Sequence, residues 1–357
     1  MAVNLKRFLI FYFVIFILLL FTLQVKAKVT GECYKCHTMH NSQNGQPMTF
    51  NGTSGQVPLL LRGTCLGCHG QNPSGSQYII ENIPQVLHAS PIDLPAGNFA
   101  YITGNKQTQG ANSTTAGHNV IDLGVQETVL TSPPGDINNT GITNTNFTCA
   151  GTYGCHGDRT IQDPYTAMRG AHHTDDSILK FGSIDLNKQG DTVGTSFRFL
   201  KGVKGGEVSW SNYPTPYNHN EYYGATTPGT GNATTPAGNT ISGFCAECHG
   251  KFYGSTNVGS SSPWLRHPTD TVLPSANEYA YYTTYNSTAP VARTSSWNGW
   301  SASSPSTTVT PGSDVIMCLS CHYAHASPYF KLMRWDYKGW PGSGGTNGCN
   351  VCHTKKD

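Results

Sequence analysis

The sequence predicts an irregular fold that is mostly coil, with a few short helices and minimal strand. Only 37% of the residues are hydrophobic, while glycine (40) and proline (21) are abundant. A chain this poor in aliphatic residues does not readily build an ordinary core from its own side chains. All 12 cysteines, however, fall into six units in which a cysteine pair is followed directly by a histidine. We therefore expect the chain to wrap around the groups that these units bind.

Five of the units have the spacing Cys-x-x-Cys-His. The remaining one, which is the third along the chain, has five residues between its cysteines. In order, they are Cys33/Cys36/His37, Cys65/Cys68/His69, Cys149/Cys155/His156 (the longer unit), Cys245/Cys248/His249, Cys318/Cys321/His322 and Cys349/Cys352/His353. In c-type cytochromes two such thiols bond the porphyrin, and the adjacent histidine binds the iron. The units therefore predict six covalently bound haem c groups, with the six histidines as proximal ligands. The predicted fold class is accordingly a multihaem c-type cytochrome wrapped around a chain of stacked haems.

Other roles for paired cysteines are less consistent with this pattern. Such pairs also bind zinc, act as redox dithiols or form disulfides. A zinc ribbon brings its pairs together in twos and does not need a histidine after every second cysteine. For Cys149 and Cys155 the alternative is a structural disulfide, because the longer loop must bulge between the two thioether positions.

Secondary structure is expected to be sparse, with each attachment unit on one helical turn. Short helices are predicted over Thr166–His173 and Ser320–Ser327, short strands over Phe197–Leu200 and Glu207–Trp210, and loops over Thr226–Gly243 and Ser295–Gly312.

The first 27 residues resemble a secretory signal peptide. Lys6 and Arg7 precede an apolar run over Phe8–Phe21, and the small residues before and at Ala27 suit a cleavage site. The alternative is an uncleaved anchor, since the apolar stretch can be extended to Val25, near the lower limit for spanning a bilayer. Cleavage is favoured because the first attachment unit follows within a few residues. We therefore expect a signal peptide over 1–27, a single domain over 28–357 and no membrane span after cleavage.

The net charge argues against a nucleic-acid partner. The formal charge of +2 falls to −1 once Lys6, Arg7 and Lys26 leave with the signal peptide. Each haem adds two propionates against one net positive charge on ferric iron. The mature holoprotein is thus expected to be acidic.

Eight of the 14 histidines lie outside the attachment units. They are His40, His88, His118, His172, His173, His219, His267 and His325. Six haems need six distal ligands, so the supply suffices for bis-histidine ligation throughout. Such haems transfer electrons but offer no open position to a substrate.

Position along the chain separates these distal candidates. His40 and His325 each lie three residues beyond a proximal histidine, so neither can reach the opposite face of the same iron. Each must bind a neighbouring haem or none. His172 and His173 are adjacent, so we expect only one of them to be a ligand. His219 is as consistent with a hydrogen-bonded structural residue as with a ligand.

Several longer segments resemble the family of hexahaem, filament-forming outer-surface cytochromes of metal-reducing bacteria (the OmcS type). The matching segments, in order, are Glu32–Ser42, Gly117–Asn119, Phe197–Leu200, Leu265–Pro268, Cys318–Ser327 and Cys349–Lys355. The resemblance implies a head-to-tail homopolymer whose haems form one continuous line. It also implies that His40 binds the iron of a neighbouring protomer, at the haem attached to Cys318/Cys321/His322. Contacts of this kind that do not close on themselves generate filaments.

The chain departs from the family pattern at the third unit. The family has a regular motif followed by Asp-Pro-His, whereas here Gly157-Asp158-Arg159 follows the longer unit. A distal histidine is therefore missing at this point, and His172 or His173 is the candidate replacement.

Three functions are compatible with these features. The first is a non-enzymatic conduit for extracellular electron transfer, secreted to the cell surface as a filament that passes electrons to extracellular acceptors or redox partners. The second is a monomeric periplasmic or secreted electron shuttle with the same haems. The third is a multihaem reductase, which needs one open or unusually ligated haem, and no Cys-x-x-Cys-Lys unit is present. The sequence favours the first.

Overall fold

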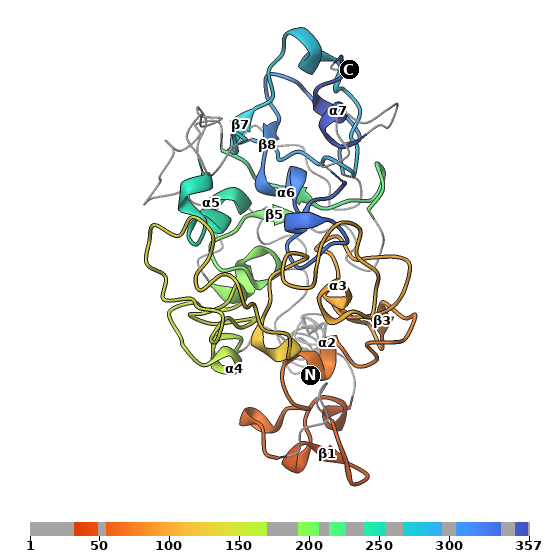
Figure 1. Cartoon of the computed structure of the whole chain (residues 1–357), viewed down its shortest axis with the longest axis vertical. Helices are drawn as coiled ribbons and strands as arrows, with labels where there is room; N and C mark the ends of the chain where they lie inside the picture. Colours follow the sequence, from red (N-terminus) through yellow and green to blue (C-terminus); the bar gives the residue numbers. More distant parts are fainter. Residues whose placement is uncertain are drawn as a thin grey trace, which may run out of the picture.

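The computed structural model describes residues 32–48, 55–169, 192–206, 214–225, 239–253, 267–294, 305–336 and 347–355. These residues are mostly in irregular structure and extend along one long axis (Figure 1). The small hairpin of β1 (Ser42–Gln43) and β2 (Gln46–Pro47) lies at one end, and α7 (Cys349–Cys352) lies towards the other. The predicted fold class, mostly coil with a few short helices and minimal strand, is confirmed.

No described α-helix is longer than six residues. These helices are α2 (Cys65–His69), α3 (Ala100–Thr103), α4 (Pro164–Ala167), α5 (Ile241–Ala246), α6 (Cys318–Cys321) and α7. The 3-10 turns are η1 (Cys33–Lys35), η2 (Met39–Asn41), η3 (Pro58–Leu60), η4 (Ile121–Leu123), η7 (Val193–Thr195), η8 (Phe197–Phe199), η9 (Gly250–Phe252), η10 (Asn277–Tyr281) and η11 (Phe330–Leu332). Helices this short are not stable alone in water, so their stability comes from tertiary contacts.

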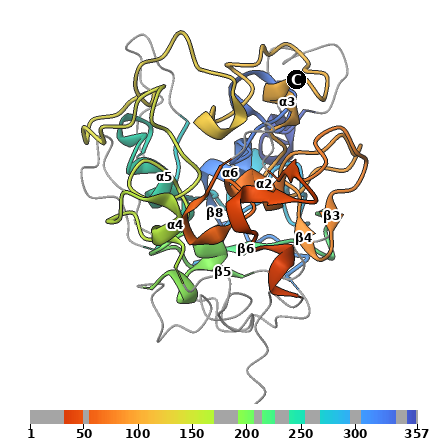
Figure 2. The ribbon, with the colours of Figure 1, turned by 90° about the horizontal axis from the view of Figure 1, so that it is seen from below.

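The described strands form four two-stranded antiparallel sheets. Besides β1 and β2, they pair β3 (Ile79–Ile80) with β4 (Ile83–Pro84), β5 (Gly205–Gly206) with β6 (Glu221–Tyr222), and β7 (Thr271–Val272) with β8 (Val315–Ile316). The last two pairs join segments that lie far apart in the sequence. Seen along the long axis, α2, α6 and β8 lie near the centre with coil around them (Figure 2).

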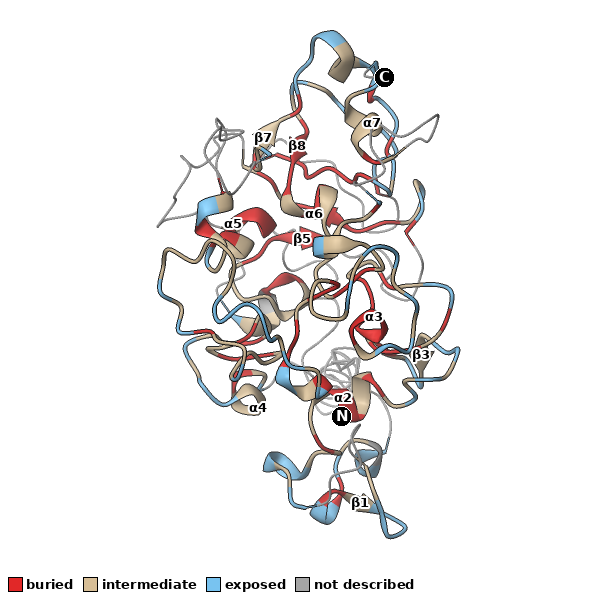
Figure 3. Ribbon diagram, in the orientation of Figure 1, coloured by how far each residue is buried: buried red, intermediate tan, exposed pale blue. Residues whose placement is uncertain are grey.

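Buried hydrophobic side chains gather in separate clusters rather than one core. One cluster contains Leu66 of α2, and Cys149 packs against it. A second contains Leu319 of α6, and a third has Cys352 of α7 packed against it. Figure 3 shows the buried segments distributed along the length of the molecule. Each of these clusters therefore lies beside an attachment unit.

Each regular attachment unit begins in a helical turn, as expected. The turns are η1, α2, α6, α7 and the last residues of α5. The prediction does not hold for Cys149–His156, which has no helix.

Two other local predictions are wrong. The strand predicted over Phe197–Leu200 is the turn η8, since Arg198 and Phe199 have φ of 52° and 59°. Positive φ is incompatible with an extended strand. The helix predicted from Ser320 to Ser327 ends at Cys321, because His322 is extended, with φ −115° and ψ 152°.

Two predictions hold only in part. Helix α4 begins at Pro164, where the Asp163 side chain accepts a hydrogen bond from the Thr166 N–H. It overlaps the predicted helix only over its first two residues. The loop predicted to reach Gly243 gives way to α5 at Ile241. The signal segment 1–27, residues 170–173 and the strand predicted over Glu207–Trp210 lie outside the described residues.

Within the described residues, no helix has the length and apolar character needed to cross a bilayer.

Candidate haem-binding sites

The six attachment units follow one another in space in the order of the chain. The Cys65 thiol lies close enough to the Cys149 thiol to raise its pKa, and Cys318 does the same to Cys245. Burial raises the pKa of the Cys68 thiol to about 11, with Cys36 of the first unit contributing.

The remaining junctions show the same proximity. Burial raises the pKa of Cys248 to about 12, and Cys155 of the third unit adds to the shift. The pKa of Cys321 also rises to about 12, with burial as the first cause and Cys352 as the second. Every unit is therefore close to the next, from the first to the sixth.

The longer third unit has the backbone geometry of a regular one. The N–H groups of Cys155 and His156 both donate to the Cys149 carbonyl, at 3.2 and 3.0 Å. In the first unit the N–H groups of Cys36 and His37 bond the Cys33 carbonyl at 3.2 and 2.8 Å. The extra residues are therefore looped out without separating the ends of the unit.

A glycine makes this loop possible. Gly151 has φ of +80°, and a Cβ there would lie 2.8 Å from the Ile161 carbonyl oxygen. Its N–H closes the loop by donating to the His156 carbonyl at 2.9 Å. Neither Cys149 nor Cys155 is in a disulfide.

The histidines of all six attachment units use ring Nδ1 in a hydrogen bond to another segment. The acceptors are the carbonyls of Leu59 for His37 (3.0 Å), Pro84 for His69 (2.9 Å), Arg198 for His156 (3.1 Å), Pro134 for His249 (2.8 Å) and Lys331 for His322 (2.8 Å), and the Glu278 carboxylate for His353 (2.8 Å). A carbonyl or carboxylate can only accept, so Nδ1 carries the proton and Nε2 is left bare. Metal-binding histidines show this arrangement almost without exception. The six units therefore fit haem iron.

Three of these acceptors lie in the same unusual turn. Leu59 in η3, Arg198 in η8 and Lys331 in η11 have φ of 59°, 52° and 58°, and the next residue in each turn also has positive φ. Each pair of consecutive left-handed residues without glycine is strained, by about 1–3 kcal/mol per residue.

The turns are anchored to the attachment units by a second bond. The residue after His37, His156 or His322 donates its N–H to the carbonyl of the turn's third residue, at 2.7–2.8 Å. Each of these three turns thus presents two successive carbonyls to its attachment unit. The first accepts a hydrogen bond from the histidine ring, and the second accepts one from the backbone N–H of the residue after the histidine.

Three of the attachment-unit histidines have a second histidine ring about 6 Å away. Ring centroids are 6.0 Å apart for His249 and His118, 6.2 Å for His156 and His325, and 6.3 Å for His353 and His267. Two imidazoles that share an iron, with metal–nitrogen bonds of about 2 Å, have centroids about 6 Å apart. The three pairs therefore have the spacing of bis-histidine ligation.

Close backbone contact brings His118 and His325 into place. The N–H of His118 donates to the His325 carbonyl at 2.9 Å, and the N–H of His325 donates to the Ala96 carbonyl at 2.7 Å. Gly117 permits this approach, since a Cβ there would lie 2.6 Å from the His325 carbonyl oxygen. The His118 Nδ1 bonds the Ala324 carbonyl at 2.7 Å, which leaves Nε2 bare.

Burial keeps these rings neutral, as metal binding requires. It lowers the pKa of His118 and of His156 to about 4, and that of His325 well below its usual value. Among the described residues, the buried Nδ1 of His325 has no hydrogen-bond partner.

The other distal candidates lie in different environments. His40 is exposed in η2 at the end of the molecule that carries β1, with φ of 57°. His88 is buried, and its Nδ1 accepts the Ser90 N–H at 3.2 Å, the reverse of the pattern above. His172 and His173 lie outside the described residues. Among the described residues, the histidine ring beside His156 is that of His325.

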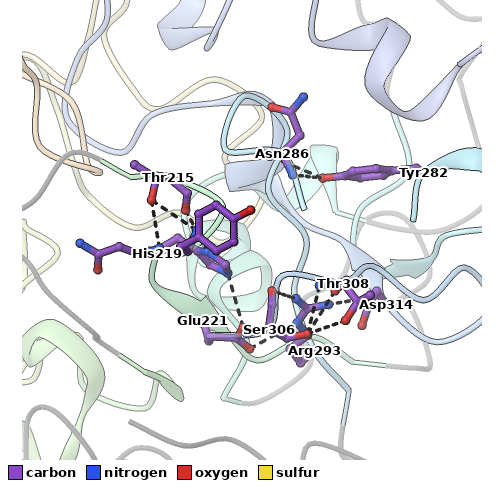
Figure 4. Close-up of polar contacts among 11 residues, drawn as sticks. Thr215, His219, Glu221, Tyr282, Asn286, Arg293, Ser306, Thr308 and Asp314 are labelled. Carbon is purple, nitrogen blue, oxygen red and sulfur yellow. Dashed lines mark hydrogen bonds and ion pairs between the residues drawn. The ribbon is translucent and has the colours of Figure 1, made fainter. Parts of the chain in front are cut away.

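His219 belongs to a buried polar network (Figure 4). Its ring stacks on Tyr285 with centroids 3.4 Å apart, and Nδ1 bonds the Thr215 carbonyl at 3.1 Å. Its Nε2 lies 3.5 Å from a Glu221 carboxylate oxygen. Glu221 and Asp314 both pair with Arg293, which ties three distant segments together. The Nδ1 bond is thus the same as that of the attachment-unit histidines, but Nε2 lies beside a carboxylate and not opposite another described histidine ring.

The carbonyl acceptors and Glu278 were not predicted from the sequence. Any residue supplies a carbonyl, so the sequence holds no signal for one. Of the acceptor residues, Arg198 lies in a segment, Phe197–Leu200, that resembles the cytochrome family.

The fold and these sites define a multihaem c-type cytochrome. Residues 311–357 match the family described as the doubled CXXCH motif. The chain is 28% identical to the C-type cytochrome OmcS of Geobacter sulfurreducens over 363 residues, covering 86% of this chain and 79% of that protein. The resemblance found in the sequence is thereby confirmed.

Two solved structures are also similar. They are described as OmcS nanowires and as an outer membrane cytochrome S filament, both from Geobacter sulfurreducens. The identities are 20% and 21% and the TM-scores 0.47 and 0.48, over 86% of this chain and 84% of those chains.

Proposed function

We propose that the chain is a non-enzymatic conduit for long-range extracellular electron transfer, carrying six haem c groups in a head-to-tail polymer. The observation that supports this most directly is the order of the attachment units. Each unit is close to the next, so haems bound to them would form one line through the molecule. Residues 28–357 form a single domain in this proposal, because a haem line that hinged open would lose its continuity.

The ring geometry supports a specific ligand assignment. His118 is the distal ligand for the haem of His249, His325 for that of His156, and His267 for that of His353. His88 and one of His172 or His173 remain as candidates for the haems of His37 and His69. These haems have no open position, which accords with electron transfer rather than reduction of a bound substrate.

The haem of His322 takes its distal ligand from another copy of the chain in this proposal. His40 supplies it, from an exposed turn at one end of the molecule. The filament reported for the similar cytochrome OmcS supports a polymer of this kind. We place the filament at the cell surface, where it passes electrons to extracellular acceptors.

Substituting His40 tests the polymer directly. His40→Ala should leave six haems attached, since no attachment residue changes, but convert one haem to high spin and abolish filaments. Mass spectrometry counts the haems, absorption spectra report spin, and cryo-electron microscopy of sheared cell-surface material reports filaments. His40→Asn is a second variant that suits the left-handed turn, because asparagine tolerates positive φ.

Imidazole provides the control. Added to the His40→Ala protein, it should restore the low-spin spectrum without restoring filaments, which separates loss of a ligand from loss of the link. Normal filaments from either variant would disprove the intersubunit bond. Discrete particles from the wild-type chain would favour the monomeric shuttle.

A further inference from the structure

The proximal histidine of the sixth unit differs from the other five in the charge of its partner. Five Nδ1 atoms donate to neutral backbone carbonyls, whereas the His353 Nδ1 donates to the carboxylate of Glu278. The donor–acceptor distance is 2.8 Å, within the 2.8–3.1 Å range of the other five. The His353–Glu278 hydrogen bond therefore differs from the other five in the charge of its acceptor and not in its length.

Contacts on both sides hold Glu278 against His353. Glu278 lies in η10, and the chain just after the sixth unit returns to that turn. The Thr354 hydroxyl donates to the Glu278 carbonyl at 2.6 Å, and Lys355 Nζ bonds the Tyr281 hydroxyl at 2.8 Å. The Tyr279 ring meets His353 edge-on, with centroids 5.1 Å apart. The carboxylate is thus part of a built site rather than a chance surface contact.

A carboxylate on Nδ1–H makes the imidazole a stronger electron donor. Hydrogen bonds to charged acceptors are roughly twice as strong as neutral ones. They draw the proton away from the ring and raise the basicity of a metal-bound histidine. Negative charge on the ligand stabilises ferric iron more than ferrous iron, so it lowers the reduction potential. Only 22% of the His353 side chain and 15% of the Glu278 side chain are exposed, which limits screening by water.

We infer that Glu278 is a positioning residue that makes the haem of His353 the lowest-potential haem of the protomer. The inference rests on the proposed function, in which His353 binds haem iron. An electron moving along the line then meets one uphill step in each protomer, at the sixth haem. That step recurs in every copy and would limit the rate of transport without giving it a direction.

The test is spectroelectrochemical titration of the Glu278→Gln protein. Glutamine keeps an acceptor oxygen but removes the charge. The most negative of the six one-electron steps should move to a more positive potential. The expected change in its equilibrium constant is on the order of tenfold, which corresponds to a shift of about 59 mV. The other five steps should not move by comparable amounts.

Glu247→Gln is the matched control. Glu247 lies within the fourth attachment unit and pairs with Arg159, but the His249 ring bonds the Pro134 carbonyl instead. Removing its charge tests the effect of a nearby carboxylate that does not touch a proximal histidine. An equal shift in both variants, or no shift in Glu278→Gln, would overturn the inference.

Haem counting separates this result from failure of the proposed function. Six low-spin haems in the wild type, together with an unmoved titration curve in Glu278→Gln, reject only the role of Glu278. If instead His353 does not bind iron, the wild type itself will show fewer than six low-spin haems.

A measurement on the wild-type protein covers the case in which Glu278→Gln loses its sixth haem. The protein is reduced stepwise and the remaining ferric signals are recorded by electron paramagnetic resonance. The haem that is reduced last should show the narrower g-value spread of a strongly donating, imidazolate-like histidine. If that signal disappears early in the titration, the inference is wrong.

Discussion

Two hydrogen bonds orient the histidine of an attachment unit, one from its backbone and one from its ring. His156 shows both, since its N–H bonds the Cys149 carbonyl at 3.0 Å and its Nδ1 bonds the Arg198 carbonyl at 3.1 Å. The first bond is local and belongs to the attachment unit. The second crosses 42 residues of sequence. The sequence predicted the unit, but neither the acceptor nor the His325 ring opposite could be read from it, because both depend on long-range packing.

At the third haem, we predict that His325→Leu leaves six haems attached and converts one of them to high spin. The reason is the 6.2 Å separation of the His325 and His156 rings, together with the burial that lowers the pKa of His325 and keeps its ring neutral. Leucine fills most of the space beside Phe99 but cannot bind iron. Absorption and electron paramagnetic resonance spectra measure the spin state.

Two further substitutions complete this experiment. His219→Gln should keep every haem low-spin, because its Nε2 faces Glu221 rather than another histidine. An all-low-spin His325→Leu protein would contradict the assignment. It would return attention to His172 and His173, tested by the same substitution.

Short turns, rather than helices or strands, are the elements that hold the histidines. The repeated turn in η3, η8 and η11 presents two carbonyls on consecutive left-handed residues. The sequences of the three turns have nothing in common except bulky side chains. The Phe-x-Phe pattern of η8 is even typical of a strand. Sequence patterning failed here because the preference for extended structure is worth less than the two hydrogen bonds to the attachment unit.

For the turn η11, we predict that Lys331→Pro destabilises the protein by about 2 kcal/mol or more. Proline fixes φ near −65°, whereas Lys331 has φ of 58°, and it removes the N–H that donates to the Thr115 carbonyl at 2.8 Å. The His322 ring should lose its acceptor as a consequence. Thermal unfolding and the low-spin fraction measure the two effects.

Lys331→Gly is the control for this substitution. Glycine adopts positive φ without strain and keeps both the N–H and the carbonyl, so stability should stay within about 1 kcal/mol of the wild type. Similar losses in both variants would mean that the lysine side chain, and not the turn, supports His322.

At the scale of the whole molecule, the described residues form no single continuous core of side chains. Its buried hydrophobic residues lie in separate clusters beside the attachment units, among segments that are mostly coil. The described strands are only two residues long, and isolated two-stranded hairpins are marginally stable at best. Haems between the clusters would join them into one apolar interior.

We predict that residues 28–357 made without haem attachment do not unfold cooperatively. Separate clusters of this size do not offset the conformational entropy of so long a coiled chain. Near-ultraviolet circular dichroism should show little fixed tertiary structure, and urea should cause a gradual change instead of a sigmoidal one. The haem-loaded protein provides the comparison, and a sharp transition in the haem-free chain would contradict the prediction.

The sequence by itself indicated the class of protein and the sparse secondary structure, and it predicts the attachment residues. Those properties depend on spacings within a few residues and on composition, which do not require knowledge of the fold. The tertiary structure alone decided which ring lies opposite which and which group accepts each Nδ1–H. His118 bonds Ala324 across 206 residues, and His353 bonds Glu278 across 75. Such contacts depend on the packing of distant coil segments, for which local sequence carries no periodic signal.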